Sequence, residues 1–169
     1  PVSGGTIGAK DGTLSIMAGG NKEAIILAMP IFNVLGKKFT HVGPVGTGQI
    51  AKTANQIIVG LNIGAVAEAL ALAKSAGADP VRVCDSLTGG FADSRVLELH
   101  GQRMLYENFE PGARSTIQQK DLAQAIELAK DLGLELPATK TVKTLYDKLI
   151  NAGHGTLDHS ALIKVIDTD

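Results

Sequence analysis

The chain of 169 residues has one cysteine, no tryptophan and few aromatic residues of any kind. A single cysteine excludes an internal disulfide and points to a reducing compartment, so we expect a cytoplasmic protein. Cys84 falls in the apolar stretch 81–87, which indicates a buried and unreactive thiol rather than a nucleophile. Because aromatic residues make up only 4% of the chain, its core must be aliphatic and rich in alanine, which favours closely packed helices.

Concentrated positive charge is also absent. The formal net charge is −1, and the few arginines are scattered among acidic residues rather than interleaved with aromatic ones. Nucleic-acid binding depends on a concentrated positive face, so we expect no nucleic-acid partner. No apolar run approaches the roughly 18 residues that a membrane span needs, so we expect no membrane partner either.

The histidines and the first residues exclude further classes. His41, His100, His154 and His159 show no paired ligand spacing, and the chain has no cluster of cysteine and histidine, so the sequence predicts no metal site. His159 follows Asp158, which we expect to cap a helix, so a polar role at the helix start is the simpler reading. The chain opens on Pro-Val-Ser-Gly-Gly without a signal peptide, and we expect it to be a truncated piece of a longer protein.

Residues 1–45 have an α/β pattern. Polar and apolar residues alternate between the glycines of 12–20, which predicts a short strand, and a helix follows over 22–35. A second strand is predicted over 39–42, closed by the glycine-rich segment 43–48. Two short strands make a poor sheet alone, so we interpret 1–45 as the C-terminal remnant of a dinucleotide-binding α/β domain.

Residues 46–169 are predicted to be helical throughout. Apolar residues keep a helical spacing from 50 to 73, which predicts one long helix of about seven turns. Asp79-Pro80 is typical of a helix start, and Gly133 of a C-terminal cap. Further helices are predicted over 94–105, 117–132 and 142–150, and a last short one after Asp158. The fold class is therefore mainly α, with an all-α domain that the long helix opens.

Lys52 and Asn55 are the first candidates for chemistry. A glycine turn, Gly46-Thr47-Gly48, launches the long helix, and Lys52 and Asn55 then occupy adjacent positions on one helix face. The unpaired N–H groups of a helix start disfavour an ammonium ion and so favour a lysine that exchanges protons near neutral pH. The alternative from spacing alone is a solvated lysine in the first turns.

Two other motifs could bind ligands. Ser3, Gly4 and Gly5 offer a hydroxyl and accessible main-chain N–H groups, which suit a carboxylate or phosphate; the alternative is an ordinary turn. Lys120 and Asp121 form a lone charged pair within a predicted helix, and from the sequence alone a surface pair is the favoured interpretation. A phosphate-binding GxGxxG after a strand is absent, since the glycines of 43–48 do not form that motif.

Taken together, these motifs resemble the β-hydroxyacid dehydrogenases, the family that includes the 3-hydroxyisobutyrate and 6-phosphogluconate dehydrogenases. The similarity covers the whole chain in the right order. It is carried by residues 1–5, by Gly12-Thr13-Leu14 with 17–20, by Gly46-Thr47-Gly48 with Lys52 and Asn55, and by Lys120-Asp121-Leu122. The resemblance implies a Rossmann domain, most of which is missing here, and then an all-α substrate and dimerisation domain of the 6-phosphogluconate dehydrogenase C-terminal type over 46–169.

The resemblance also implies roles. Lys52 would be the general acid/base, with Asn55 beside it contacting substrate; Ser3, Gly4 and Gly5 would hold the substrate carboxylate; and Lys120 would approach the nicotinamide of NAD or NADP. The substrate would be a small 3-oxo or 3-hydroxy carboxylic acid, and the stretch 158–162 is most similar to enzymes that reduce tartronate semialdehyde to glycerate. A 3-hydroxyisobutyrate dehydrogenase or related small-aldehyde reductase remains an alternative. So does a non-catalytic helical oligomerisation module, and in either case we expect a homo-oligomer.

Overall fold

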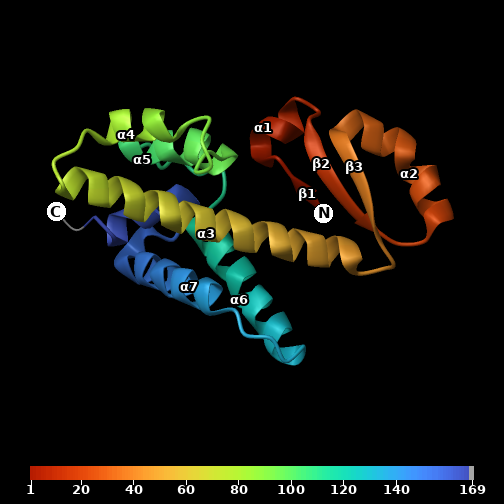
Figure 1. Ribbon diagram of the computed structural model, residues 1–169. Helices are drawn as coiled ribbons and strands as arrows, with labels where there is room; N and C mark the ends of the chain where they lie inside the picture. Colours follow the sequence, from red (N-terminus) through yellow and green to blue (C-terminus); the bar gives the residue numbers. More distant parts are fainter. Residues whose placement is uncertain (168–169) are drawn as a thin grey trace. The chain divides into compact units, whose positions relative to one another are not determined.

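The computed structural model describes residues 1–167, and its chain divides into two compact units (Figure 1). The first unit, 1–56, contains a small sheet with its helices, and the second begins at residue 57 and is helical over its described residues. The long helix α3 (Thr47–Ser75) begins in the first unit and continues in the second.

The α/β unit is built on a three-stranded sheet in the order β1-β2-β3. The strand β1 (Val2–Ser3) pairs antiparallel with β2 (Leu14–Gly19), which pairs parallel with β3 (Gly36–Gly43). The helices α1 (Gly5–Lys10) and α2 (Lys22–Leu35) connect the strands. The two predicted strands and the helix 22–35 are present, while β1 and α1 were not predicted, because a two-residue strand has no alternation to detect.

The end of β2 lies directly against the start of α3. A Cβ atom placed on Gly19 would lie 2.5 Å from the carbonyl oxygen of Pro44, and one on Gly48 would lie 2.7 Å from the carbonyl oxygen of Met17. Only glycine fits at either position without displacing backbone. The turn before α3 is held by Thr47, whose hydroxyl donates to the Pro44 carbonyl at 2.7 Å. These contacts fix where α3 begins, and hence where its first turns present Lys52.

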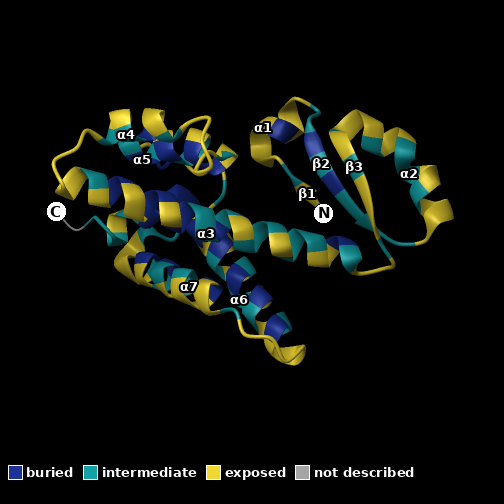
Figure 2. Cartoon of the chain, viewed as in Figure 1, coloured by how far each residue is buried: buried dark blue, intermediate teal, exposed yellow. Residues whose placement is uncertain are grey.

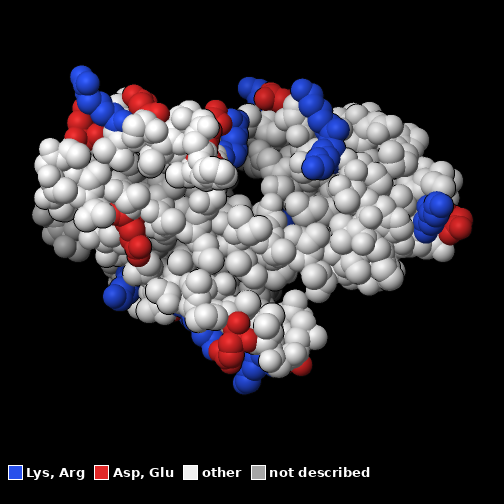
Figure 3. Space-filling view, viewed as in Figure 1, with Lys and Arg blue, Asp and Glu red and all other residues white. Residues whose placement is uncertain are grey.

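Helix α2 has no buried residue, although it is rich in isoleucine and leucine. Leu27 is 81% exposed and Val34 is 75% exposed. Figure 2 shows the helix without buried positions, and in Figure 3 the part of the surface to which α2 belongs is mostly uncharged. An apolar helix face of this kind needs a partner layer to remove it from water. The α/β unit is therefore an incomplete layer structure by itself.

Helix α3 corrects one expectation drawn from the sequence. The helix is long and apolar enough, by length and composition, to cross a membrane, whereas we had expected no such segment. Its apolar residues are interrupted by glycine, alanine and amide side chains, so the run does not stand out in the sequence. One face of α3 supplies Ile63, Ala67 and Leu70 to the core of the helical unit, although only 39% of the apolar segment of α3 is buried.

The helices of the helical unit occur in the predicted order, but their boundaries differ from the predicted ones. π-helical and 3₁₀-helical segments also occur among them. Asp79 accepts a hydrogen bond from the Val81 N–H and starts the first helix after α3, as predicted. Gly133 has a φ of 71° just after the third α-helix of that series, which confirms the predicted cap. The elements are α4 (Pro80–Leu87), the π-helix η1 (Leu97–Gly101), α5 (Gln102–Leu105), α6 (Ser115–Asp131), α7 (Pro137–Leu149), the π-helix η2 (Ile150–His154) and the 3₁₀-helix η3 (His159–Val165).

The core of the helical unit is aliphatic, as the composition predicts. Tyr146 is its one buried tyrosine among the described residues, and its hydroxyl donates to the His159 carbonyl at 3.1 Å. Cys84 is buried, and burial raises the pKa of its thiol, with a smaller effect from Asp85, so the prediction of an unreactive cysteine agrees with its surroundings. The side chains that are completely excluded from solvent here include Ile63, Leu122, Leu149 and Leu162.

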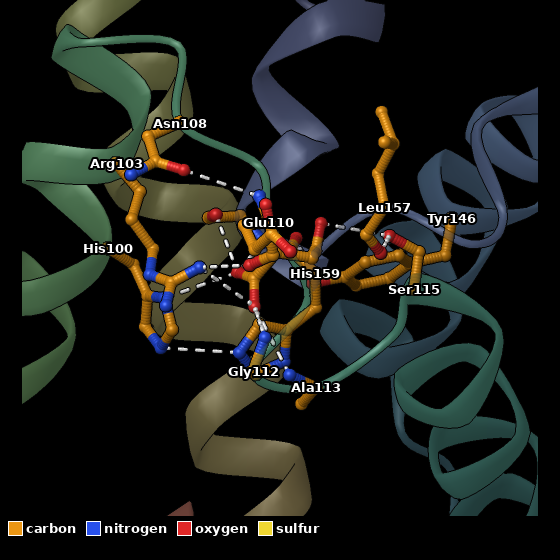
Figure 4. A network of polar contacts seen from close by, with 12 residues as sticks. His100, Arg103, Asn108, Glu110, Gly112, Ala113, Ser115, Tyr146, Leu157 and His159 are labelled. Atoms are coloured by element: carbon orange, nitrogen blue, oxygen red, sulfur yellow. Dashed lines mark hydrogen bonds and ion pairs between the residues drawn. The ribbon is translucent and has the colours of Figure 1, made fainter. Parts of the chain in front are cut away.

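A buried aspartate, Asp158, connects two loops of this unit, and Figure 4 labels Gly112 and Ala113, the residues of the first loop that it contacts. The carboxylate of Asp158 accepts hydrogen bonds from the N–H groups of Gly112 and Ala113, and from the N–H and hydroxyl of Ser160. The bond to the Ser160 N–H confirms the predicted cap. Burial alone would raise the pKa of Asp158, but the contacts from His100 and Ser160 hold it well below the usual range.

Candidate active site

Lys52 and Asn55 lie in the first turns of α3, within the α/β unit. Both side chains are half-buried, and their spacing places them on one face of the helix, as predicted. Asn55 Nδ2 donates to Gln56 Oε1 at 2.9 Å. This bond orients the Asn55 amide, and the sequence analysis did not single out Gln56. The only signal in the sequence was that Gln56 directly follows Asn55.

Ser3, Gly4 and Gly5 form the junction between β1 and α1 in the same unit. Gly4 has a φ of 135° and Gly5 a φ of 63°, which side-chain-bearing residues rarely adopt. A Cβ atom placed on Gly5 would meet nothing within 4 Å, so the space beside its backbone is open. The segment therefore combines an accessible backbone with a half-buried hydroxyl, at the end of a strand fixed by the pairing of Ser3 with Ser15.

Lys120 lies in α6, in the helical unit. Its Nζ is 3.3 Å from Asp121 Oδ1, and its side chain is 61% exposed. The charged pair noted in the sequence is therefore real and reaches solvent from within the helix. The structure thus brings Ser3, Gly4, Gly5, Lys52 and Asn55 into one unit and places Lys120 in the other.

The α/β unit contains hydrogen-bond donors of the kinds that a carbonyl substrate with a carboxylate group requires. A lysine ammonium group can donate a proton to an oxygen that becomes negative, and an amide can hydrogen-bond to the same oxygen. The hydroxyl and main-chain N–H groups at 3–5 are donors suited to a carboxylate. Among the described residues of this unit the only histidine is His41, and its Nε2 contacts the carbonyl oxygens of Gly20 and Gly43, each at 3.0 Å. The His41 imidazole therefore contacts the main chain just after β2 and at the end of β3.

Two family models match adjacent parts of the chain. Residues 1–43 match the NAD-binding domain of 6-phosphogluconate dehydrogenase, and residues 46–166 match the model described as NAD-binding of NADP-dependent 3-hydroxyisobutyrate dehydrogenase. The second match covers more than two thirds of the chain. Lys52, Asn55 and Lys120 fall inside it, and Ser3 to Gly5 fall inside the first.

Proteins with known names show the same relationship. The chain is 53% identical over 167 residues to 2-hydroxy-3-oxopropionate reductase of Escherichia coli. The aligned region covers 99% of this chain but 57% of that protein. It is 43% identical to an uncharacterized oxidoreductase, YkwC, of Bacillus subtilis, with 98% of this chain and 57% of that protein covered. The chain therefore spans somewhat more than half the length of these relatives.

Solved structures agree with the sequence relatives. A crystal structure of 3-hydroxyisobutyrate dehydrogenase from Salmonella typhimurium has a TM-score of 0.92 and 31% identity, over 98% of this chain and 58% of that one. A 3-hydroxyisobutyrate dehydrogenase from Mycobacterium tuberculosis, solved with L-serine, has a TM-score of 0.88 and 29% identity, with 98% and 59% covered. The chain belongs to the 3-hydroxyisobutyrate dehydrogenase family of NAD(P)-dependent β-hydroxyacid dehydrogenases.

Proposed function

We propose that the complete protein containing this chain reduces tartronate semialdehyde (2-hydroxy-3-oxopropanoate) to glycerate with NADH or NADPH, and runs the reverse oxidation. The observation that carries the proposal is the Lys52–Asn55 pair on one face of α3, in a chain 53% identical to a 2-hydroxy-3-oxopropionate reductase. The chain supplies the acid/base and carboxylate-binding groups, and residues 1–45 are the C-terminal remnant of the cofactor domain. The reaction is cytoplasmic in this proposal.

Each residue has one task in the proposed reaction. Ser3 and the main-chain N–H groups of Gly4 and Gly5 bind the substrate carboxylate and so orient the aldehyde. Lys52 Nζ donates a proton to the aldehyde oxygen as negative charge develops there, and accepts a proton from the hydroxyl in the oxidative direction. Asn55, oriented by Gln56, hydrogen-bonds to the same oxygen. The nicotinamide, when bound, supplies the hydride.

The residues of this chain fit a bound dinucleotide. The exposed apolar face of α2 marks a unit that needs a further layer, as the remnant of a dinucleotide-binding domain would. Lys120 reaches solvent and offers a positive charge to the nicotinamide side of the cofactor. The groups that distinguish NAD from NADP belong to the part of a Rossmann domain that these residues do not include.

The proposal is tested by comparing kcat/KM for tartronate semialdehyde and methylmalonate semialdehyde, with the complete protein and with both cofactors. A clear preference for tartronate semialdehyde supports the proposal. A preference for methylmalonate semialdehyde favours the alternative, a 3-hydroxyisobutyrate dehydrogenase, which is motivated by the TM-score of 0.92 to an enzyme of that name. Turnover of neither substrate would overturn the proposal.

A homo-oligomer formed by the helical unit is part of the proposal. Ile58, Ala65 and Leu72 recur at seven-residue intervals along α3 and are all exposed. An exposed stripe that combines bulky and small side chains is suited to close packing against a second helix. Light scattering should therefore give a multiple of the 17.5 kDa chain mass, and Leu72→Glu should shift it toward the monomer. A wild-type monomer would contradict this part.

The isolated chain is proposed to be inactive, acting at most as a helical oligomerisation module. Without the remaining cofactor-domain layers, dinucleotide affinity should be lost. Calorimetric titration of the 169-residue chain with NADH and NADPH checks this, with the complete protein as the control. Tight binding to the chain alone would show that its cofactor site is already complete.

A further inference from the structure

We infer that His100 and His159 form a binding site for one zinc ion in the helical unit, with Asp158 orienting the His100 ring. The site uses none of the residues proposed for substrate or cofactor. His100 belongs to η1 and His159 begins η3, 59 positions later in the chain. Folding alone brings the two imidazoles together, which is why linear spacing predicted no metal site. Figure 4 shows His100 directed toward His159 in the close view.

The distance between the rings suits a tetrahedral ion. The Nε2 atoms of His100 and His159 lie 3.2 Å apart, with the ring planes at 87°. Two nitrogen ligands at about 2.0–2.1 Å from a tetrahedral zinc ion are separated by roughly 3.3 Å. The ion can therefore replace the single hydrogen shared by the two Nε2 atoms, and that hydrogen moves to the Nδ1 atom of the ring that carried it, so both imidazoles bind in their neutral form. Both imidazoles and the Asp158 carboxylate offer ligand atoms within 4.8 Å of one another.

The remaining nitrogen of each ring, Nδ1, does not bind the proposed ion and is free to orient the imidazole. The Nδ1 atoms of His100 and His159 are buried without a hydrogen-bond partner among the described residues. His100 Nδ1 is 3.6 Å from Asp158 Oδ1. A metal on Nε2 makes the Nδ1–H a stronger donor, so zinc would tighten this contact into the carboxylate–histidine–zinc arrangement.

The surroundings set how tightly the ion is held. Asp158 is completely buried and His159 nearly so, while the His100 side chain is 18% exposed. Water reaches the ion from the His100 side and fills its two other positions. Arg103 Nη1 lies 3.3 Å from Asp158 Oδ2 and already balances that negative charge. The guanidinium therefore opposes the ion, and its removal should strengthen binding.

The test is a calorimetric titration of the untagged chain with zinc chloride, repeated with variants of single side chains. We expect one ion per chain, with His100→Gln and His159→Gln each lowering the affinity at least 10-fold. His154→Gln is the matched control, since this half-buried histidine of the same unit lies outside the cluster and should leave the affinity unchanged. Arg103→Gln, which removes the guanidinium charge and its hydrogen bond to the Glu110 carbonyl, should raise the affinity several-fold.

Cobalt substitution gives a second readout, because tetrahedral Co²⁺ absorbs visible light far more strongly than octahedral Co²⁺. The proposal predicts this absorption in the wild type and in His154→Gln, and its loss in His100→Gln. Circular dichroism must show that each variant is folded. If His159→Gln does not fold, His100→Gln and Arg103→Gln are sufficient to test the proposal. The proposal is overturned if zinc does not bind, if binding survives His100→Gln, or if Arg103→Gln leaves the affinity unchanged.

Discussion

The hydroxyl of Tyr146 in α7 donates a hydrogen bond to the main-chain carbonyl of His159, and the tyrosine is completely buried. Burial raises the pKa of Tyr146 well above its ordinary value, with a smaller contribution from Asp158, so the hydroxyl remains a donor. Tyr146→Phe keeps the ring but leaves the buried carbonyl unpaired, which should lower the free energy of unfolding by about 1–3 kcal/mol. Urea denaturation measures the free energy of unfolding. Tyr106→Phe, at a tyrosine that is 68% exposed, should change it by less than about 0.5 kcal/mol; equal effects would contradict the role of the bond.

The stability contributed by Asp147 should depend on pH. Partial burial opposes ionisation of Asp147, but hydrogen bonds from Lys143 and Gln119, each 2.7 Å, outweigh it and lower its pKa. A lowered folded-state pKa stabilises the protein above the unfolded value, about pH 4, and this contribution disappears as pH falls further.

Asp147→Asn should therefore cost roughly 0.5–1 kcal/mol at pH 7, a modest value because a third of the side chain is exposed. The difference from wild type should narrow below pH 4. Denaturation at a series of pH values measures it, with Asp131→Asn, at an exposed carboxylate ending α6, as the control. A difference that is the same at pH 3 and pH 7 would show that the charge is not responsible.

Lys52 is expected to act on turnover. In the complete protein, Lys52→Met keeps much of the side-chain volume and removes the proton donor, so kcat should fall on the order of 10²- to 10⁴-fold. Steady-state kinetics of aldehyde reduction provide the measurement, and Lys22→Met, at an exposed lysine that starts α2, is the control. Near-normal kcat in Lys52→Met would remove this residue from the mechanism.

Ser3 is expected to act on substrate binding. Ser3→Ala removes a hydroxyl that would donate to the substrate carboxylate, and a hydrogen bond to a charged group contributes about 1.5–3 kcal/mol. The KM should rise about 10-fold or more while kcat changes little. Ser15→Ala tests the opposite residue on the neighbouring strand, which should leave KM unchanged. If both variants behave alike, the effect of Ser3→Ala comes from the sheet rather than from the hydroxyl.

The helices were predictable from the sequence because their signals are local. Asp79-Pro80 marks a helix start, and the apolar spacing from 50 to 73 marks a long helix, wherever the rest of the chain lies. The strand β1 was not predictable in this way, since two residues carry no period and their pairing with Ile16 and Ser15 is a contact between distant segments.

Among the polar residues too, some pairs are close in the sequence and others are brought together only by folding. Lys52 and Asn55 share a helix face, so their spacing predicted their proximity. His100 and His159 are separated by 59 positions, and no local pattern could connect them. In α3 the strongly apolar residues alternate with small and amide residues. Counting an uninterrupted apolar run therefore underestimates the mean hydropathy of this helix.

Gly19 and Gly48 approach each other so closely that they act as one steric constraint. A Cβ on Gly19 would lie 2.7 Å from the Gly48 nitrogen, and a Cβ on Gly48 would lie 2.9 Å from the Gly19 nitrogen. Either alanine would already separate the strand end from the helix start, so the second would find the space opened by the first. The free-energy costs of the two substitutions should therefore fail to add. In evolution the two glycines should be kept together or lost together.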